Sequence, residues 1–289
     1  MVILPEHRWA DAASTWRDAE ALGFAHAWTY DHLAWRSLRD SPWFAAVPIL
    51  AAAATVTSRL RLGTLVASPN FRHPVPLARE VLALDDLSDG RFDLGVGAGA
   101  DGWDATVLGH PPWAPAERSE RFAEFVDLLD QLLTKREVTY SGRYYRADGA
   151  RSYPGCRQHP RVPFFVAAAG PKAMAVVARH GQAWVTTGPR SFDEPLGAAD
   201  GARAVARQLR LLEATCDALG REFGSLRRVV LTGQALDQGI SSEQKFADVI
   251  GSYEQIGVTD LVVHWPRARA PFQGERAVFE RVIAANRTA

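Results

Sequence analysis

The residues with the clearest capacity for chemistry are Asp31 and His32, which end a short apolar run at residues 26–30. An imidazole changes charge near neutral pH, so His32 could donate a hydrogen bond or carry a proton during a reaction. The same two residues could instead form a structural Asp–His pair that ties a loop. Their position alone leaves both interpretations open, and we take His32 as the candidate catalytic residue.

A glycine-rich stretch, residues 95–102, follows another apolar run. Residues 97–102 match the G-x-G-x-x-G pattern, but a dinucleotide-binding fold needs a helix directly afterwards and an acidic residue about 20 positions further on. Here the chain continues instead into the proline-rich segment 110–115. The glycines therefore indicate either a ligand that approaches the backbone closely or a tight packing turn.

Two further segments carry groups that bind anions. The segment 170–172 (Gly-Pro-Lys) opens a predicted helix, whose first N–H groups have no partner within the helix. The segment 187–190 (Thr-Gly-Pro-Arg) follows the next apolar run and adds a hydroxyl, a flexible glycine and a guanidinium. Together they predict a phosphate site. Ordinary helix capping beside a surface arginine is the alternative.

Other chemistries lack their residues. The eight histidines show no H-E-x-x-H or H-x-H spacing, and the chain has no G-x-S-x-G motif. The carboxylates form no evident acid–base pair at strand ends. We therefore predict no metal ligands and find no support for a cofactor-free hydrolase. Tryptophans in or beside the same loops could line a pocket for a flat ring, and these are Trp35, Trp43, Trp103 and Trp113.

The elements that must position these side chains alternate along the chain. Eight runs, most of them apolar on both faces, are predicted as buried parallel strands, and helical periodicity fills the intervals. Eight strands alternating with helices in 289 residues predict an α/β fold, a closed (β/α)8 TIM barrel with its active site at the C-terminal strand ends. An open doubly wound sheet is the alternative. The strands are expected at 2–5, 26–30, 60–66, 92–96, 163–168, 183–187, 228–232 and 260–264, and the helices at 9–22, 44–57, 76–87, 117–133, 172–180, 199–219, 241–256 and 274–285.

One segment breaks this alternation. Residues 138–146 are typical of a β-hairpin with Ser141 and Gly142 at its turn, and prolines interrupt the stretch that follows. We expect residues 137–162 to be an insertion packed over one end of the barrel. No linker-like stretch divides the chain, so residues 1–289 are predicted to form a single domain.

Composition narrows the setting. Lys+Arg and Asp+Glu are both 33, so the formal net charge is zero, which argues against a nucleic-acid partner. The longest apolar run, residues 43–54, is too short for a membrane span and contains a proline. The two cysteines, Cys156 and Cys216, lie far apart. The first residues lack the basic region of a secretory signal, and we expect a cytoplasmic protein.

The chain resembles the bacterial-luciferase-like family of flavin-type oxidoreductases. The resemblance covers about residues 1–190 closely and the remainder loosely, and the order and spacing of its landmarks make it specific. These landmarks are residues 20–24 (EALGF) leading to 28–32 (WTYDH), 61–64 (RLGT) leading to 72–74 (RHP), 84–99 (LDDLSDGRFDLGVGAG) and 170–174 (GPKAM).

The resemblance implies a (β/α)8 barrel that binds the deazaflavin coenzyme F-420 or, alternatively, FMN. Leu65 and Val66 would lie behind the ring, where family members often have a bulge and a non-prolyl cis peptide. Gly97 and Gly99 would lie along its edge, and His32 would face its reactive part. The phosphate would be held by Ala169, Gly170, Thr187, Gly188 and Arg190. A basic rim of Arg72, Lys172 and Arg190 would suit the acidic tail of F-420.

The family also implies hydride transfer or oxygen activation on a small organic substrate, a homodimer, and in some cases a separate reductase. Relatives that oxidise glucose 6-phosphate carry a glutamate directly after the Gly-x-Gly, where this chain has Ala100. Their chemistry is therefore in doubt here, and a non-catalytic flavin-binding relative is the alternative function.

Overall fold

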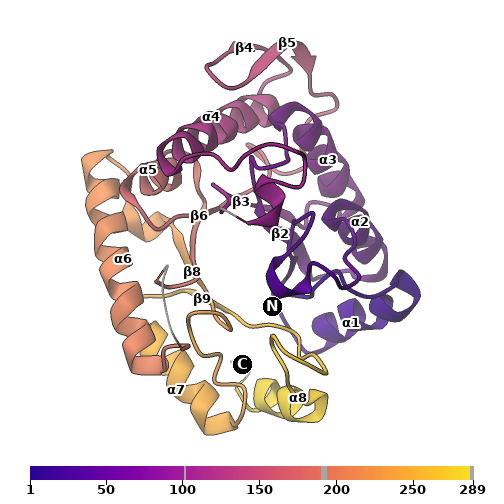
Figure 1. Ribbon diagram of the computed structural model, residues 1–289, viewed down its shortest axis with the longest axis vertical. Helices are drawn as coiled ribbons and strands as arrows, with labels where there is room; N and C mark the ends of the chain where they lie inside the picture. Colours follow the sequence, from indigo (N-terminus) through magenta and orange to yellow (C-terminus); the bar gives the residue numbers. More distant parts are fainter. Residues whose placement is uncertain (101, 190–193, 287–289) are drawn as a thin grey trace.

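The computed structural model of the chain describes residues 1–100, 102–189 and 194–286, and no helix in these ranges is long and apolar enough to cross a membrane. Strands and helices alternate and form two concentric layers, with the strands inside (Figure 1). The helices are α1 (Trp9–Ala21), α2 (Ala46–Val56), α3 (Pro74–Leu87), α4 (Pro115–Thr134), α5 (Pro171–His180), α6 (Ala198–Ala218), α7 (Glu243–Glu254) and α8 (Arg276–Ala285). The strands are β1 (His26–Thr29), β2 (Arg61–Ala67), β3 (Phe92–Gly97), β4 (Glu137–Ser141), β5 (Arg146–Arg151), β6 (Phe164–Ala167), β7 (Ala183–Thr186), β8 (Arg227–Leu231) and β9 (Asp260–Val262).

Seven strands form one parallel sheet in the order β1-β2-β3-β6-β7-β8-β9. Val2 joins its two edges, since it forms parallel bridges with both Trp28 and His264. Its N–H donates to the carbonyl of Val263 at 2.7 Å, and the N–H of Ile3 donates to the carbonyl of Trp28 at 2.8 Å. The sheet is thus a TIM-barrel-like ring, which confirms the predicted fold class, and the alternative of an open sheet is wrong.

The first predicted strand, residues 2–5, is reduced to one residue, Val2, with its two bridges. The chain bends at Pro5, which has no N–H to continue a ladder. The other seven predicted strands and all eight predicted helices begin and end within two residues of the observed elements. Alternation of apolar runs with helical periodicity was therefore sufficient to place them.

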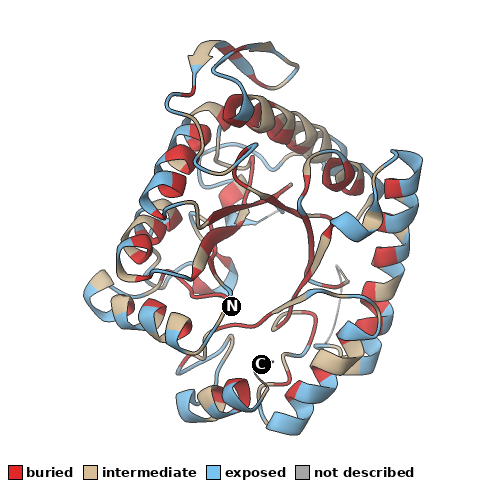
Figure 2. Ribbon diagram, turned by 180° about the vertical axis from the view of Figure 1, so that it is seen from behind, coloured by how far each residue is buried: buried red, intermediate tan, exposed pale blue. Residues whose placement is uncertain are grey.

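The barrel has an inner and an outer apolar layer because successive strand residues face opposite sides. On β6, Phe165 belongs to the inner cluster and Phe164 to the cluster between strands and helices. Inside, the rings of Trp28 and Phe165 lie 4.8 Å apart between centroids. Gly63 makes room for them, since an added Cβ would lie 2.4 Å from the Trp28 ring. Figure 2 shows the buried strands and the buried inner faces of the helices.

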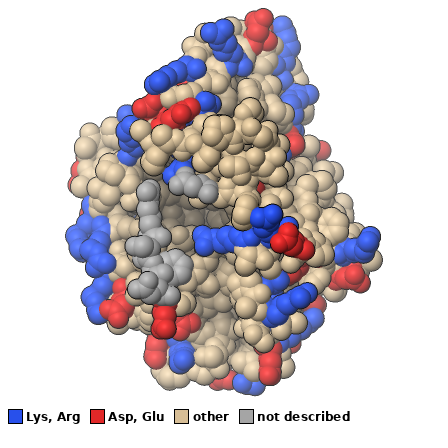
Figure 3. Space-filling model, in the orientation of Figure 1, with Lys and Arg blue, Asp and Glu red and all other residues tan. Residues whose placement is uncertain are grey.

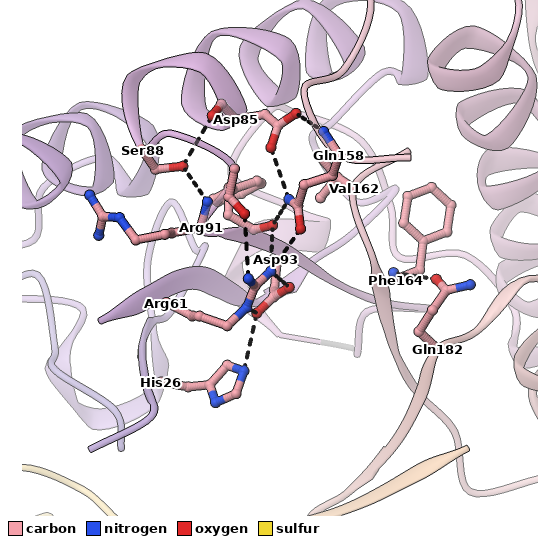
Figure 4. Close-up of polar contacts among 12 residues, drawn as sticks. His26, Arg61, Asp85, Ser88, Arg91, Asp93, Gln158, Val162, Phe164 and Gln182 are labelled. Carbon is pink, nitrogen blue, oxygen red and sulfur yellow. Dashed lines mark hydrogen bonds and ion pairs between the residues drawn. The ribbon is translucent and has the colours of Figure 1, made fainter. Parts of the chain in front are cut away.

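Charged side chains meet at the amino-terminal end of the strands (Figure 4). Asp93 is 1% exposed, accepts from Arg61 Nε at 2.8 Å and lies 3.2 Å from His26 Nε2. Arg61 also donates to Gln158 Oε1 at 2.9 Å, and Gln158 donates to Asp85 Oδ1 at 2.8 Å. Burial lowers the pKa of His26. Every member has a partner, so this cluster ties three strands and the insertion together rather than offering a reactive group.

The insertion forms the β4–β5 hairpin, which lies against α4 outside the helical ring (Figure 1). Its turn is longer than predicted, because β5 begins only at Arg146 and Gly142 N–H donates to the carbonyl of Tyr145 at 2.9 Å. Glu124 of α4 accepts hydrogen bonds from the N–H groups of Tyr144 at 2.9 Å and Tyr145 at 2.7 Å. These two N–H groups are thereby removed from the ladder.

Candidate functional site

A cavity of about 1030 Å³ opens at the C-terminal ends of the barrel strands. Figure 3 shows this hollowed face, with Lys and Arg side chains around it. Segments after β1, β2, β3, β6, β7 and β8 and the first turn of α4 form its wall. The lining brings together nine residues predicted from the sequence: His32, Leu65, Val66, Gly97, Gly99, Ala169, Gly170, Thr187 and Gly188. Arg190 lies outside the described residues.

Strand β2 forms the back of the cavity. The Leu65–Val66 peptide is cis, and the register between β2 and β3 shifts between Thr64 and Ala67. Val66 leaves no room for a side chain at Gly97 on the neighbouring strand, because an added Cβ there would lie 2.6 Å from Val66 Cγ2. A strip of bare backbone therefore runs along the wall, which suits a flat ligand that needs close contact.

Asn70, on the loop after β2, supplies a polar atom beside this strip. Its Nδ2 donates to the carbonyl of Ala100 at 3.1 Å. Its Oδ1 is buried and has no hydrogen-bond partner among the described residues. A buried acceptor without a partner is costly, and a ligand N–H at this place would satisfy it. Sequence reasoning missed Asn70, because an asparagine between two prolines is typical of a turn.

The groups predicted to bind an anion come from two adjacent loops. Gly170 caps α5, so the first-turn N–H groups of Lys172 and Ala173 have no carbonyl four residues back within the helix. In the β7–α6 turn, Gly188 N–H donates to Thr186 Oγ1 at 3.0 Å. Gln208 of α6 holds that turn, accepting from Thr186 Oγ1 at 2.6 Å and donating to the carbonyl of Gly188 at 3.1 Å.

His32 is held from both sides. Its Nδ1 is hydrogen-bonded to Asp104 Oδ2, and Trp43 Nε1 donates to its carbonyl at 2.8 Å. The other carboxylate oxygen of Asp104 accepts from the N–H groups of Leu33 at 2.7 Å and Ala34 at 3.1 Å. The His32 ring lines the cavity, and its Nε2 has no hydrogen-bond partner in the described part of the chain.

A second histidine, His264, is paired with Tyr30, which lines the cavity. The hydroxyl of Tyr30 lies 2.7 Å from His264 Nε2 and accepts from Gln234 Nε2 at 3.0 Å. Burial lowers the pKa of His264 well below its usual value and raises the pKa of Tyr30. Both groups are therefore neutral near pH 7, so this pair can offer hydrogen bonds but no charge.

The four predicted tryptophans separate into two groups. Trp35 and Trp103 line the cavity, Trp35 buried and Trp103 43% exposed. Trp43 lies behind them, stacked on Trp35 with centroids 6.1 Å apart. Trp113 is not among the lining residues and instead lies under the guanidinium of Arg121, 4.3 Å from the ring centroid.

The prediction that Arg72 belongs to a basic rim is wrong, because its guanidinium is paired with two carboxylates and it is not among the described residues that line the cavity. Arg72 makes two hydrogen bonds with the buried Asp31, at 2.7 and 2.9 Å, and a third with Glu80 at 3.0 Å. Asp31 is thereby turned to Arg72, so it does not form the Asp–His pair considered for His32. Lys172 lines the cavity, and its Nζ lies 3.5 Å from Glu120.

Asp104 is the functional residue that the sequence pattern missed most clearly. It lies 72 positions from His32, in a short 3-10 turn (Trp103–Ala105) that follows the glycine-rich stretch. The only available signal was an acidic residue near the end of a barrel strand. Within the described ranges, no three His, Cys, Asp or Glu side chains gather as metal ligands would.

Comparisons with known proteins identify the family of the chain. The family model described as luciferase-like monooxygenase matches residues 2–258. An F-420-dependent glucose-6-phosphate dehydrogenase of Beutenbergia cavernae is 34% identical, over 86% of this chain and 85% of that protein.

Two solved structures share the fold. One is an F-420-dependent secondary alcohol dehydrogenase in complex with an F-420–acetone adduct, 18% identical, with a TM-score of 0.79 over 99% of this chain and 98% of that one. The other is the coenzyme F-420-dependent tetrahydromethanopterin reductase of Methanopyrus kandleri, 17% identical, with a TM-score of 0.75 over 99% and 95%. The match of the family model across most of the chain, together with the Beutenbergia relative, shows that this protein belongs to the luciferase-like monooxygenase family of flavin- and F-420-dependent oxidoreductases.

Proposed function

We propose that this protein is an F-420-dependent oxidoreductase that transfers a hydride between the coenzyme and a small organic substrate. The observation that carries the proposal is that one cavity brings together a bare backbone strip, the groups predicted to bind an anion and a positioned histidine. The Beutenbergia relative is named as an F-420-dependent protein, which favours F-420 over FMN. FMN with oxygen activation is the alternative.

The cavity suits a planar ring with a phosphate tail. Leu65, Val66, Gly97 and Gly99 would hold the ring, and the unpartnered Oδ1 of Asn70 would accept a hydrogen bond from the imide N–H that both ring systems carry. Ala169 and Gly170 at the start of α5, together with Thr187, would hold the phosphate through backbone N–H groups and the Thr187 hydroxyl. Gly188, whose own N–H donates to Thr186 Oγ1, would set the direction of this turn against the phosphate. Arg190 would add a charge-assisted contact.

When bound, the deazaflavin supplies a ring carbon that accepts or releases a hydride. The protein's own contribution is to orient the substrate against that ring, exclude water and manage one proton. We assign the proton to His32 Nε2, because it faces the cavity without another partner among the described residues. Trp35 and Trp103 would form the substrate side of the pocket.

Absorbance titration of the purified protein with oxidised and reduced F-420, and with FMN, tests the cofactor. Saturable F-420 binding that is at least tenfold tighter than FMN binding is expected. Tighter FMN binding would favour the monooxygenase alternative, and binding of neither would refute the proposal. Tight binding without turnover across a panel of alcohols, aldehydes, ketones and electron-poor alkenes would indicate the non-catalytic relative.

Substitution of His32 tests the catalytic assignment. We expect His32→Ala to lower kcat about 100-fold, the lower end of the range for general acid–base groups, while the Kd for the coenzyme changes less than about threefold. Turnover at the wild-type rate would remove His32 from the reaction. A homodimer and a separate reductase partner remain proposals from the family, to be tested by light scattering and by coupled assays.

A further inference from the structure

We propose that Asp104 is the positioning residue for His32, fixing the proton on Nδ1 so that Nε2 faces the cavity as a proton acceptor. The inference rests on the proposed function, because it specifies how the assigned proton-transfer group is oriented. Asp104 borders the cavity, but its two carboxylate oxygens bond the His32 ring and the N–H groups of Leu33 and Ala34, so we assign its effect to the imidazole that it holds.

The inference rests on the contacts of the Asp104 carboxylate, whose hydrogen bonds among the described residues all go to the loop after β1. One oxygen bonds His32 Nδ1, and the other accepts from the N–H groups of Leu33 and Ala34 at 2.7 and 3.1 Å. The Asp104 side chain is 5% exposed and that of His32 is 29% exposed. A single buried carboxylate thus fixes both the ring and the backbone directly after it.

Two other acidic side chains of the described residues, Asp31 and Glu6, are committed to arginines. Asp31 is adjacent in sequence but forms its ion pair with Arg72. Glu6 forms two hydrogen bonds with Arg267, at 2.6 and 2.7 Å. In the described part of the chain, Asp104 is therefore the carboxylate that His32 contacts.

A carboxylate can only accept at Nδ1, so a neutral His32 must carry its proton there and present a lone pair at Nε2. When a substrate hydroxyl releases its proton, Nε2 binds it, and Asp104 stabilises the imidazolium that results. In the reverse direction the same N–H returns the proton. Aspartate–histidine pairs in unrelated enzymes work by the same electrostatic logic.

The tautomer of His32 in the wild-type protein can be measured without cofactor. Long-range proton–nitrogen correlation spectra of protein with ring-labelled histidine, assigned with His32→Ala, report which nitrogen carries the hydrogen. We expect neutral His32 to be protonated at Nδ1. In Asp104→Asn, the side-chain oxygen keeps accepting from Leu33 and Ala34, so the NH2 group must face Nδ1 and the proton moves to Nε2. A wild-type ring protonated at Nε2, or an unchanged tautomer in the variant, would overturn the proposal.

Kinetics provide a second readout that a merely structural role would not reproduce. We expect Asp104→Asn to lower kcat at least tenfold with little change in the Kd for F-420, and to have less than about a threefold effect when added to His32→Ala. An equal loss in both backgrounds would mean that Asp104 does not act through His32.

Asp85→Asn is the matched control. Asp85 is also buried and accepts from two backbone N–H groups, those of Arg157 at 2.6 Å and Gln158 at 3.2 Å, but at the opposite end of the barrel. It should lose stability without changing the His32 tautomer or kcat. If no coenzyme binds, the proposed function fails, whereas the tautomer measurement still decides the role of Asp104.

Discussion

Gly188→Ala separates anchoring of a phosphate at the β7–α6 turn from the general stability of the fold. Gly188 has φ +89°, a left-handed conformation in which a side chain costs about 1–2 kcal/mol. An added Cβ would also lie 2.8 Å from Leu236 Cγ, so either Leu236 or the turn must move. Because Gln208 and Thr186 hold this turn only through three hydrogen bonds, we expect the turn to shift.

The expected result is a total loss of about 2–3 kcal/mol in the free energy of unfolding, measured by urea denaturation. The Kd for F-420, measured by absorbance titration, should rise at least tenfold, which corresponds to about 1.4 kcal/mol of lost binding free energy. Phosphate contacts depend on the direction of backbone N–H groups, so a small rotation of the turn is enough to weaken them.

Gly239→Ala is the control for this experiment. Gly239 has φ +71°, and an added Cβ would lie 2.8 Å from both the Lys245 carbonyl and Val249 Cγ2, but Gly239 does not line the cavity. It should lose similar stability and keep the wild-type Kd. An unchanged Kd in Gly188→Ala, or an equal rise in the control, would refute the placement of the phosphate.

Three further outcomes test the barrel and its rim. Asp93→Asn should cost about 3 kcal/mol, because it leaves Arg61 without its buried partner; a loss below about 1 kcal/mol by urea denaturation would contradict this. The His180 and Arg161 side chains lower the pKa of Asp130 from 3.8 to about 2, so its ionised form adds stability that is fully present above about pH 4 and is lost as the pH falls towards 2. Asp130→Asn should therefore lower stability by about 1 kcal/mol at pH 7, allowing for a side chain that is 31% exposed, and thermal melts of variant and wild type should converge near pH 2; a constant gap would argue against it. Trp103→Ala should raise KM several-fold while the free energy of unfolding changes by less than about 0.5 kcal/mol, and an unchanged KM would place the substrate elsewhere.

The sequence predicted the barrel well because its signal is local. Each strand is a short apolar run and each helix a periodic one, and the C-terminal strand ends then bring their loops together. That rule alone places the segments around Gly97, Gly170 and Gly188 on one cavity. The hairpin turn was placed less accurately, because Glu124 of α4 determines where β5 begins and no local pattern encodes that contact.

Side-chain pairing was less accessible than the backbone path. Arg72 was expected at the rim, but its fork geometry matches Asp31 on the preceding loop, 41 positions away. Asp104 and His32 are likewise joined only when two loops fold against each other. Trp113 illustrates the same difficulty, because its place beside a top-face loop did not reveal whether its ring would face the cavity or α4.

The filled interior of the barrel has a consequence for how such a chain can change. Trp28 and Phe165 pack against each other inside the barrel, and the hollows at its two ends have no lining residue in common among the described residues. Sequence changes in the loops around the cavity can therefore alter which substrate binds without disturbing the charged cluster around Asp93. New substrate preferences could thus evolve at the C-terminal end of the strands while the amino-terminal end continues to stabilise the fold.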